Sequence, residues 1–539
     1  MIPARDGDHA TPRTRGRVPW ATGLSCAVAS GVLSFLGFAG FDLWPLSFIA
    51  LVPLLIALDA EAMRGPAALA LGWLCGAIAQ AGGTYWLVGT LTRFSGHGLI
   101  VSAALAFGLW CWEGGRYALF AWIVWRARAS GRGASWIAPF AWAGVEAVYP
   151  LVLPSQLGAS LHAVPALVQL ASLGGTTLVS MLIVLVNTAC ASIAIRWRDG
   201  RPVPRAWMAI AVAALGAAWL HGRARVEAID ARTAVAPRLR VGVVQANLGP
   251  EDKGVLDGAG LRRHLDLSRR LEQGAGLDLL VWPETVVPGP LDADARSVDL
   301  AAHAEEPEPG VIAMRPALAT PVLFGALTLR TRGARPGVYN SALLTDEHGV
   351  VLGRYDKRRL LPWGEAMPWS DRFPALRALA PNASRLRAGS TNAPLQLGTV
   401  RLSVFICYED VLPELVRESV RGGRPRLLVN LTNDAWFGDT TEPWIHLALA
   451  KLRAIETGRT MVRATNSGVS AVLDPAGRVI ARAPPFRATA FVVDAPLFDE
   501  VTPFVRLGDW PGGLGLLGIA WCVLAPVAMR RGTVSRPSR

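Results

Sequence analysis

Long, nearly uninterrupted apolar runs fill the first 221 residues and constrain the fold more than any other feature. A helix needs about 20 mostly apolar residues to cross the hydrocarbon core of a bilayer. Runs of roughly this length lie near 20–37, 41–58, 67–91, 98–125, 135–154, 165–195 and 207–221, and another lies near 513–529. The sequence therefore predicts a polytopic α-helical membrane bundle with about eight transmembrane helices.

The first two runs leave alternatives open. Both are short and close together, so they could form one re-entrant hairpin in place of two spans. The stretch Ala27-Val28-Ala29 resembles a signal-peptide cleavage site, which makes a cleaved signal peptide a rival interpretation of the first run. The apolar run continues past that stretch, and this favours a retained span.

The overall composition is that of a membrane protein. Of the 539 residues, 52% are apolar and 18% are charged, whereas ordinary soluble domains carry about 25% charged residues. The net charge of +13 and the 20 tryptophans are typical of cytoplasmic loops and membrane interfaces. The membrane is therefore the expected partner, and nucleic acid is not.

The distribution of arginines predicts an orientation. Arginines precede the first run, follow the second, fourth and sixth runs, and end the chain, whereas the short loops in between carry only Arg93. By the positive-inside rule both termini are cytoplasmic and residues 222–510 lie on the opposite side. We therefore expect a multi-pass membrane protein, and if the membrane is a bacterial inner membrane this long segment lies on the periplasmic side.

These features divide the chain into five predicted parts. They are a cytoplasmic tail at 1–19, a transmembrane bundle at 20–221, an extracytoplasmic domain at 222–510, a transmembrane helix at 511–530 and a cytoplasmic tail at 531–539.

The 222–510 segment alternates short β-branched runs with helix-like and turn-rich stretches, which predicts an α/β domain. The expected strands are 241–245, 277–282, 322–329, 338–344, 402–406, 427–431 and 469–473. Residues 346–349 and 474–477 have the composition of hairpin turns, and 291–321, which shows no periodicity, is expected to form a surface excursion.

Cys407 is the one cysteine of six that lies outside the strongly apolar runs, so no disulfide can form within the polar segment. It follows the apolar stretch Ser403–Ile406 and precedes a helix expected from Leu412 onward. A thiol at such a strand-to-helix turn can be activated by helix N-H groups, which also receive a developing oxyanion. The alternative is a buried cysteine that acts as a small hydrophobe.

Two charged residues follow other strands of the same segment. Glu284 directly follows the strand-like stretch Leu279–Pro283 and is a candidate general base for the thiol. A Glu at the end of a strand is, however, often only solvated, or it caps a helix. Lys357 follows a strand-like stretch at 350–355, inside a charged run that could be a solvated face. Because ligand sites of α/β folds gather at strand ends, we expect the base, the cation and the nucleophile to meet.

Together these residues form recognisable motifs. They are Trp282-Pro283-Glu284, Tyr355-Asp356-Lys357 with Pro362-Trp363-Gly364-Glu365, Cys407-Tyr408-Glu409, Asn433-Asp434-Ala435-Trp436-Phe437-Gly438 and Arg463-Ala464-Thr465-Asn466-Ser467-Gly468. In this order, and with the apolar runs around them, they resemble the apolipoprotein N-acyltransferases, the membrane-bound branch of the nitrilase superfamily. The resemblance covers residues 20–530.

The resemblance implies an αββα sandwich and a ping-pong acyltransferase. Cys407 would take an acyl chain from a membrane phospholipid as a thioester and pass it to the α-amino group of the diacylglyceryl-cysteine that begins a bacterial lipoprotein. It also implies that Glu284 is the base, Lys357 the oxyanion-stabilising cation and Glu365 a supporting carboxylate. Tyr408 and Glu409 match residues that flank the nucleophile.

Some positions depart from the family pattern. Lys253 is followed by Gly254 where the family has a Lys-Trp pair, and Ala366 stands where an aromatic residue is usual. His446 has no His, Asp or Cys at metal-ligand spacing, so neither a metal nor another cofactor is expected. The rival functions are a membrane-tethered amidase or nitrile hydrolase with the same triad, and a transporter or receptor with a degenerate outer domain.

Three charged residues within the apolar runs have no assigned role. Glu113 and Arg116 are three residues apart, close enough on one helical face to pair, and an ion pair within the bundle is the preferred interpretation. A contact with a lipid headgroup is the alternative, and Glu146 is open between the same two interpretations.

Overall fold

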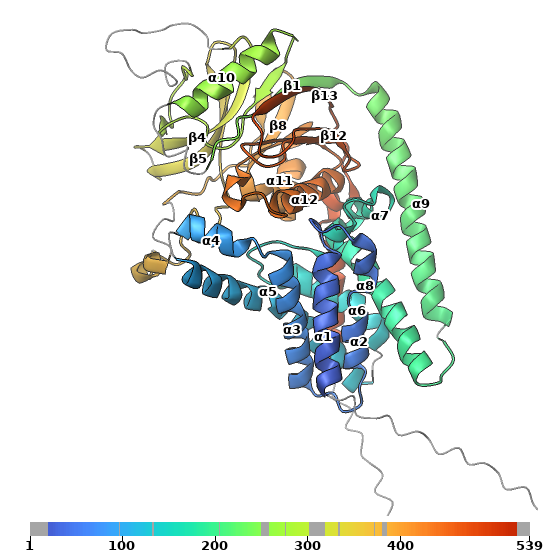
Figure 1. Ribbon diagram of the computed structural model, residues 1–539. Coiled ribbons are helices and arrows are strands. Elements are labelled where there is room, and N and C mark those ends of the chain that lie inside the picture. Colours follow the sequence, from blue (N-terminus) through green and yellow to red (C-terminus); the bar gives the residue numbers. More distant parts are fainter. Residues whose placement is uncertain are drawn as a thin grey trace, which may run out of the picture.

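The structure, a computed structural model, has a helical part and an αβ part (Figure 1). It describes residues 20–95, 98–131, 134–203, 205–249, 258–274, 276–300, 318–332, 335–370, 372–379 and 385–524. In Figure 1 the αβ part lies above the helical part, and the long helix α9 runs along the outside of the helical part and leads into the first strand.

The helical part is built mainly from the first half of the chain. Its helices are α1 Trp20–Leu36, η1 Trp44–Phe48, α2 Val52–Leu58, α3 Gly65–Gly83, α4 Leu87–Ser95, α5 Leu99–Ala129, α6 Ala134–Val148, η2 Leu157–Leu161, α7 Pro165–Val168, α8 Ala171–Arg198 and α9 Arg205–Val235, with α13 Pro503–Leu507 and α14 Trp510–Val523 near the other end.

Among the described residues, two helices, α3 and α8, are long and apolar enough to cross a membrane by length and composition. The helices α1, α6 and α14 are apolar but shorter. The expected number of about eight spans is therefore not confirmed and stays a prediction.

Several apolar runs are not single helices of the expected length. The run near 41–58 forms η1 and α2, each of which begins with a proline at its first turn, and the run near 67–91 is divided between α3 and α4. Helix α9 continues to Val235, so the domain boundary expected at 221 falls inside a helix. Helix α8 is kinked, because Gly174 and Gly175 have non-helical backbone angles.

The αβ part contains two β-sheets. The first has the strand order β13-β1-β2-β4-β5-β6, with β3 paired to β4, and the second has the order β12-β11-β10-β9-β8-β7. The strands are β1 Arg238–Gln245, β2 Leu279–Val281, β3 Leu291–Asp292, β4 Val322–Arg330, β5 Gly337–Thr345, β6 Val351–Asp356, β7 Leu395–Leu397, β8 Val400–Ile406, β9 Leu427–Thr432, β10 Thr460–Thr465, β11 Ala471–Leu473, β12 Val479–Arg482 and β13 Thr489–Pro496.

Helices cover the outer faces of the two sheets, which gives the expected αββα sandwich. The remaining helices are α10 Ala259–Glu272, η4 Pro374–Leu379, η5 Cys407–Val411, α11 Pro413–Gly423, η6 Asp434–Phe437 and α12 Glu442–Thr457. One apolar core lies between the sheets and joins Val243 and Leu344 to Val404 and Val429. Separate cores pack α10 on the first sheet and α11 with α12 on the second.

The expected strands agree with this sandwich in most places. Residues 346–349 and 474–477 connect antiparallel strand pairs, as expected of hairpin turns. The expected strand 469–473 is only β11, and the sequence interpretation missed β10, which pairs in parallel with β9. Part of the 291–321 excursion, residues 301–317, lies outside the described residues, as does Lys253.

The helical and αβ parts are joined by polar contacts, some of them buried. Glu456 of α12 accepts hydrogen bonds from the backbone N-H and the hydroxyl of Thr176, at 2.9 and 2.7 Å, just after the kink in α8. Arg453 pairs with the same carboxylate at 2.9 Å. On the other side of the junction Arg93 donates to the Trp436 carbonyl at 3.0 Å. These contacts fix the surfaces between which the candidate site lies.

Candidate functional site

A cavity of about 270 Å³ lies where the helical and αβ parts meet. The αβ part contributes all of the predicted site residues except Glu409, namely Glu284, Lys357, Glu365, Cys407 and Tyr408. The helical part contributes mostly apolar side chains, among them Phe35, Phe38, Trp86, Leu87 and Leu109. The site thus has a polar, reactive wall and an apolar wall, which suits a ligand with a reactive head and a long hydrocarbon tail.

Cys407 occupies the turn where β8 ends and η5 begins. Its backbone has a φ of +52°, a left-handed conformation that costs a non-glycine residue about 1–3 kcal/mol. The side-chain amide of Asn430 donates to the Cys407 carbonyl at 3.1 Å and helps to hold this conformation. The thiol is partly exposed to the cavity. The strand-to-helix turn inferred from the sequence is thus present as a strand followed by a 3₁₀ turn.

The position of Glu284 is fixed by a close backbone contact with Gly325 of β4. It follows β2, and the next residue, Thr285, also has a positive φ, of +49°. Gly325 of β4 packs directly beneath it, because a Cβ atom at that position would lie 2.6 Å from the Thr285 nitrogen and 2.7 Å from the Glu284 Cα. Only glycine allows this approach of the two segments.

Lys357 joins the two glutamates in a compact, buried cluster. Its Nζ lies 2.7 and 2.8 Å from the two carboxylate oxygens of Glu365 and 3.8 Å from Oε1 of Glu284. The amide of Asn340 donates to Glu284 at 2.7 Å and to Glu365 at 3.1 Å. Lys357 is only 1% exposed, so one ammonium is shared by two carboxylates away from bulk water.

The electrostatics of the cluster favour a charged lysine and a neutral resting thiol. Burial disfavours the ammonium, but the charges of Glu365 and Glu284, together with that of Cys407 whenever the thiol is ionised, outweigh it and raise the pKa of Lys357. Burial, and then the charge of Glu284, raise the pKa of the Cys407 thiol, whereas Lys357 lowers it. The thiol therefore needs a base at hand when it reacts, which is the role that the sequence assigns to Glu284.

Glu409 does not line the cavity but ties its parts together. Its carboxylate accepts backbone N-H groups from Ile406, Arg358 and Arg359 at 2.9, 2.7 and 2.9 Å, and the hydroxyl of Tyr355 at 2.8 Å. These donors lie beside Cys407 on one side and beside Lys357 on the other. Burial raises the pKa of Glu409, while the hydrogen bonds act in the opposite direction.

Tyr408 points toward the helical part. Its hydroxyl donates to the Val152 carbonyl at 3.0 Å, in the loop between α6 and η2 that lines the cavity. Burial is the main cause that raises the pKa of Tyr408 to about 12, so the phenol stays protonated and can donate.

The sequence missed a buried ionic cluster that borders the same cavity. His446 lies between Asp410 at 2.7 Å and Asp434 at 3.1 Å, and Arg463 pairs with the same two aspartates at 2.9 and 3.2 Å. The aspartates overcome the effect of burial and raise the pKa of His446 to about 10. The sequence does contain one sign of this cluster, because Glu442 and His446 are four residues apart on one helix and such residues lie on the same face.

Three members of this cluster could in principle hold a metal ion. Asp434, Glu442 and His446 place one potential ligand atom each within 4.8 Å of one another, so His446 has acidic neighbours in space that the spacing in the sequence did not reveal. However, both nitrogens of a cationic His446 face carboxylates, and the Arg463 guanidinium already balances the aspartates. A metal ion would lie beside two groups that are already positive, His446 and Arg463, so the residues fit a metal poorly.

The charged residues of the helical part do not form the expected ion pair. Glu113 accepts the backbone N-H groups of Val152 and Leu153 at 2.7 and 3.3 Å, and Arg116 donates to the carbonyl and the hydroxyl of Ser155. The preferred interpretation of a direct Glu113–Arg116 pair was therefore wrong. Glu146 likewise accepts the N-H of Leu157 at 2.7 Å. A polar loop inside an apolar bundle must satisfy its backbone groups, and these side chains do so.

Comparison with known proteins shows what the two parts resemble. A family model described as carbon-nitrogen hydrolase matches residues 240–497, and one described as apolipoprotein N-acyltransferase N-terminal domain matches residues 30–189. The apolipoprotein N-acyltransferase of Azotobacter vinelandii is 32% identical over 527 residues, which cover 94% of this chain and 95% of that protein. The chain belongs to the apolipoprotein N-acyltransferase family.

A second relative has the same name. The apolipoprotein N-acyltransferase of Geobacter metallireducens is 29% identical over 516 residues, which cover 94% of this chain and 95% of that protein. A solved variant of a nitrilase-superfamily amidase from Nesterenkonia AN1 is 25% identical, with a TM-score of 0.32, and covers 48% of this chain and 93% of its own. The two acyltransferase relatives each cover 94% of this chain and so extend over both its helical and its αβ part.

Proposed function

We propose that this chain takes an acyl chain from a membrane phospholipid as a thioester on Cys407. It then passes the chain to the α-amino group of the diacylglyceryl-cysteine that begins a bacterial lipoprotein. The observation that carries the proposal is the shared cavity, in which Cys407, Glu284 and Lys357 face a wall of apolar helical side chains. The names of the relatives support N-acyl transfer to apolipoproteins.

In the first half-reaction the thiol of Cys407 attacks the ester carbonyl of the phospholipid, and Glu284 takes the thiol proton. The tetrahedral oxyanion lies near Lys357, whose ammonium stabilises it. When the C-O bond breaks, Glu284 returns the proton to the leaving oxygen. The products are a lysophospholipid and a thioester on Cys407.

In the second half-reaction the neutral α-amine of the lipoprotein attacks the thioester carbonyl, and Glu284 accepts one amine proton. The C-S bond breaks, the sulfur recovers the proton from Glu284, and an amide is released. Both tetrahedral states need the same cation, so Lys357 acts twice. Its position between Glu284 and Glu365 keeps it charged for both steps.

The flanking residues have supporting roles in this proposal. Glu365 orients the ammonium of Lys357. Glu409 holds the backbones beside Cys407 and Lys357 in register, and Tyr408 ties the nucleophile turn to the cavity wall at Val152. All three act through other groups and are positioning residues.

The proposed setting is a bacterial inner membrane, crossed several times, with the αβ part on the periplasmic side. The distribution of arginines and the apolar helices α3 and α8 support it. Exposed apolar side chains on α9, such as Val212 and Leu220, fit contact with lipid. Labelling with a membrane-impermeant thiol reagent that reaches Cys407 only from the cytoplasmic face would contradict this orientation.

The decisive experiment follows the two half-reactions separately. The purified protein is incubated with phospholipid alone, and its intact mass is measured before and after hydroxylamine. We expect a hydroxylamine-sensitive acyl adduct together with lysophospholipid, and its discharge when a diacylglyceryl peptide is added. The Cys407→Ser variant should still bind phospholipid but form no adduct, because an alcohol is far less ionised than a thiol.

Two outcomes would contradict the proposal. Lysophospholipid that forms only when the peptide is present, without an adduct, would indicate direct transfer and remove the nucleophile role of Cys407. An adduct that releases free fatty acid to water and never acylates the peptide would indicate a membrane-tethered hydrolase instead.

A further inference from the structure

A second cavity, of about 210 Å³, lies at the end of the first sheet, and three of the nine residues that line it are arginines. Its lining includes Arg330, Arg335, Arg354, Asp356 and the segment 388–391. Three guanidinium groups face one carboxylate, so the lining carries an excess of two positive charges. We call this cavity the anion pocket.

The arginines of the anion pocket are held in place and not fully neutralised. Asp356 is shared by Arg354, whose Nε lies 3.0 Å from Oδ1, and by Arg330, whose Nη2 lies 3.6 Å from Oδ2. The same carboxylate also accepts the hydroxyl of Ser341 at 2.7 Å. Arg330 further stacks on the ring of Tyr339, with 5.0 Å between its Cζ and the ring centre.

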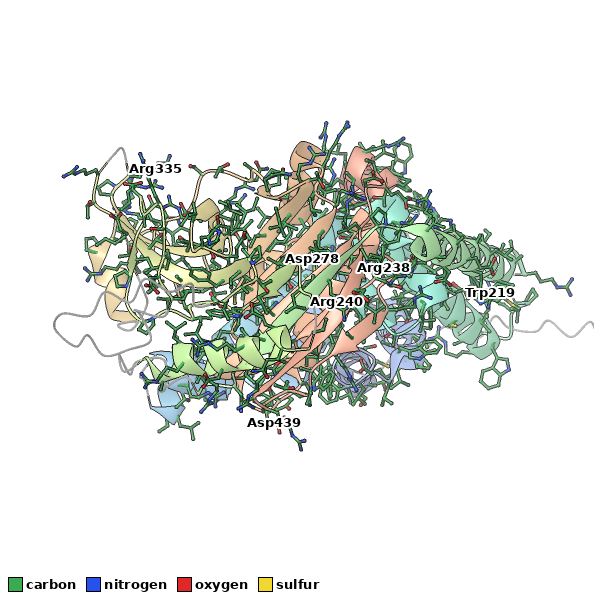
Figure 2. The ribbon with its side chains drawn as sticks, turned by 90° about the horizontal axis from the view of Figure 1, so that it is seen from above. Trp219, Arg238, Arg240, Asp278, Arg335 and Asp439 are labelled. Atoms are coloured by element: carbon green, nitrogen blue, oxygen red, sulfur yellow. The ribbon has the colours of Figure 1, made fainter. Side chains whose placement is uncertain are left out.

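The third arginine, Arg335, has no salt-bridge partner among the residues that the structure describes. The hydroxyl of Tyr339 donates to the backbone carbonyl of Arg335 at 2.6 Å and so fixes its main chain. Figure 2 shows Arg335 at one end of the αβ part, away from Arg238 and Arg240. Arg332 lies two residues after β4 ends, and Arg385 and Arg387 precede the 388–391 segment, where the N-H of Arg387 donates to the Val338 carbonyl of β5. An anion bound here would meet a strongly positive potential.

The anion pocket lies behind Lys357, on the opposite face of the same sheet. Successive residues of a strand point to opposite faces. On β6, Tyr355 packs into the core between the sheets, whereas Asp356 faces outward to Ser341. Lys357 returns to the inner side, where it meets Glu284 and Glu365.

The wall of the anion pocket also contacts the backbone of Lys357. The N-H of Gly389 donates to the Lys357 carbonyl at 2.8 Å. A Cβ atom at Gly389 would collide with the Asp356 carbonyl, so the 388–391 segment lies directly against this strand. Guanidinium groups, a hydroxyl from Ser390 and a hydroxyl from Thr391 are donors suited to a tetrahedral oxyanion.

We propose that the anion pocket binds a phosphate-type anion, with Arg335, Arg330 and Arg354 as its charged donors. The phosphate could be inorganic or belong to an anionic lipid headgroup, since both present the same oxygens. This site is separate from the acyl-transfer cavity, and the proposal does not depend on the proposed function.

The test uses the full-length protein in a neutral detergent and calorimetric titration with inorganic phosphate at constant ionic strength. We expect saturable binding, weakened about tenfold or more in Arg335→Ala through loss of a charge-assisted contact. Arg335→Lys, which keeps the charge but loses the planar fork, should bind with intermediate affinity. The matched control is Arg240→Ala, which removes the same charge from an exposed position near the start of β1 and should bind like the native protein (Figure 2).

A second arm identifies the source of the phosphate. If inorganic phosphate does not bind, nanodiscs of phosphatidylglycerol should still raise the thermal midpoint of the native protein relative to phosphatidylcholine, and Arg335→Ala should abolish that difference. That result would support a headgroup ligand. Equal phosphate affinity of Arg335→Ala and the native protein, equal weakening in Arg240→Ala, or no effect in either arm would overturn the proposal.

Discussion

Replacement of Lys357 by methionine tests whether the glutamates beside it depend on its charge. The native ammonium lies 2.7–3.8 Å from oxygens of Glu365 and Glu284 and is almost fully buried. At an effective dielectric constant of 20, unit charges 3.8 Å apart attract by about 4 kcal/mol. Removal of one partner from a buried pair typically costs about 3–5 kcal/mol, because the other charge stays buried.

The methionine variant can reduce this cost by taking up a proton on one of the two carboxyl groups. For a glutamate with an ordinary pKa near 4.3, protonation at pH 7 costs about 3.7 kcal/mol, from 2.7 pH units at 1.36 kcal/mol each. The folded variant then binds one proton more than its unfolded chain, so its stability falls as pH rises. We expect a loss of about 3–4 kcal/mol at pH 7, smaller by about 1.4 kcal/mol at pH 6.

The assay is urea unfolding of the detergent-solubilised protein, followed by pulse proteolysis at pH 6 and pH 7. The native protein, Lys357→Met, Glu365→Gln and the double variant form a double-mutant cycle. Because Glu365→Gln removes one of the two buried charges, the double variant should be more stable than Lys357→Met alone, by about 2 kcal/mol. Additive effects, or a cost that does not change between the two pH values, would refute this account of the cluster.

Three further predictions concern single side chains. Glu284→Gln should still fold, because Glu365 continues to pair with Lys357, but it should lower the rate of hydroxylamine-sensitive acylation by about 100-fold or more, and near-normal acylation would make Glu284 structural. Burial and Glu284 raise the pKa of Cys407, so the rate of its alkylation by iodoacetamide should rise about tenfold per pH unit between pH 7 and pH 8.5. The Cys407→Ser variant serves as the blank, and a plateau of this rate below pH 8 would contradict the raised pKa. Tyr408→Phe removes the hydroxyl that donates to the Val152 carbonyl and should lower the free energy of unfolding by about 1–3 kcal/mol in the same proteolysis assay. An unchanged free energy of unfolding would mean that this hydrogen bond adds no stability.

The local pattern of the sequence was sufficient for much of the αβ part. Apolar strands such as 241–245 and 402–406, and the turns at 346–349 and 474–477, follow from alternation and turn chemistry that neighbouring residues determine. The gathering of Glu284, Lys357 and Cys407 was expected on the same basis, because each residue follows a strand. The assignment of chemical roles to them came from the family motifs and is still a proposal.

The remaining features depend on partners that are distant in the chain. Strand β13 pairs along the whole of β1, some 250 residues earlier, and nothing within either segment specifies that register. Helix length in the bundle was misjudged for a related reason, since hydropathy does not report a kink such as that at Gly174 and Gly175 in α8. Proximity in sequence also suggested the Glu113–Arg116 pair, whereas both side chains serve the backbone of a loop about 40 residues away.

The turn that carries Cys407 shows why neighbouring residues can act on distant parts of the site. In a 3₁₀ turn, with three residues per turn, successive side chains point in directions about 120° apart. Cys407 therefore faces the cavity while Tyr408 reaches the helical part and Glu409 reaches the backbone beside Lys357. A left-handed cysteine persists only where its surroundings fix it more strongly than its strain opposes it. The hydrogen bonds that Glu409 accepts from the backbone of Ile406, Arg358 and Arg359 supply that restraint, so one carboxylate ties the strained Cys407 turn to the backbone beside Lys357.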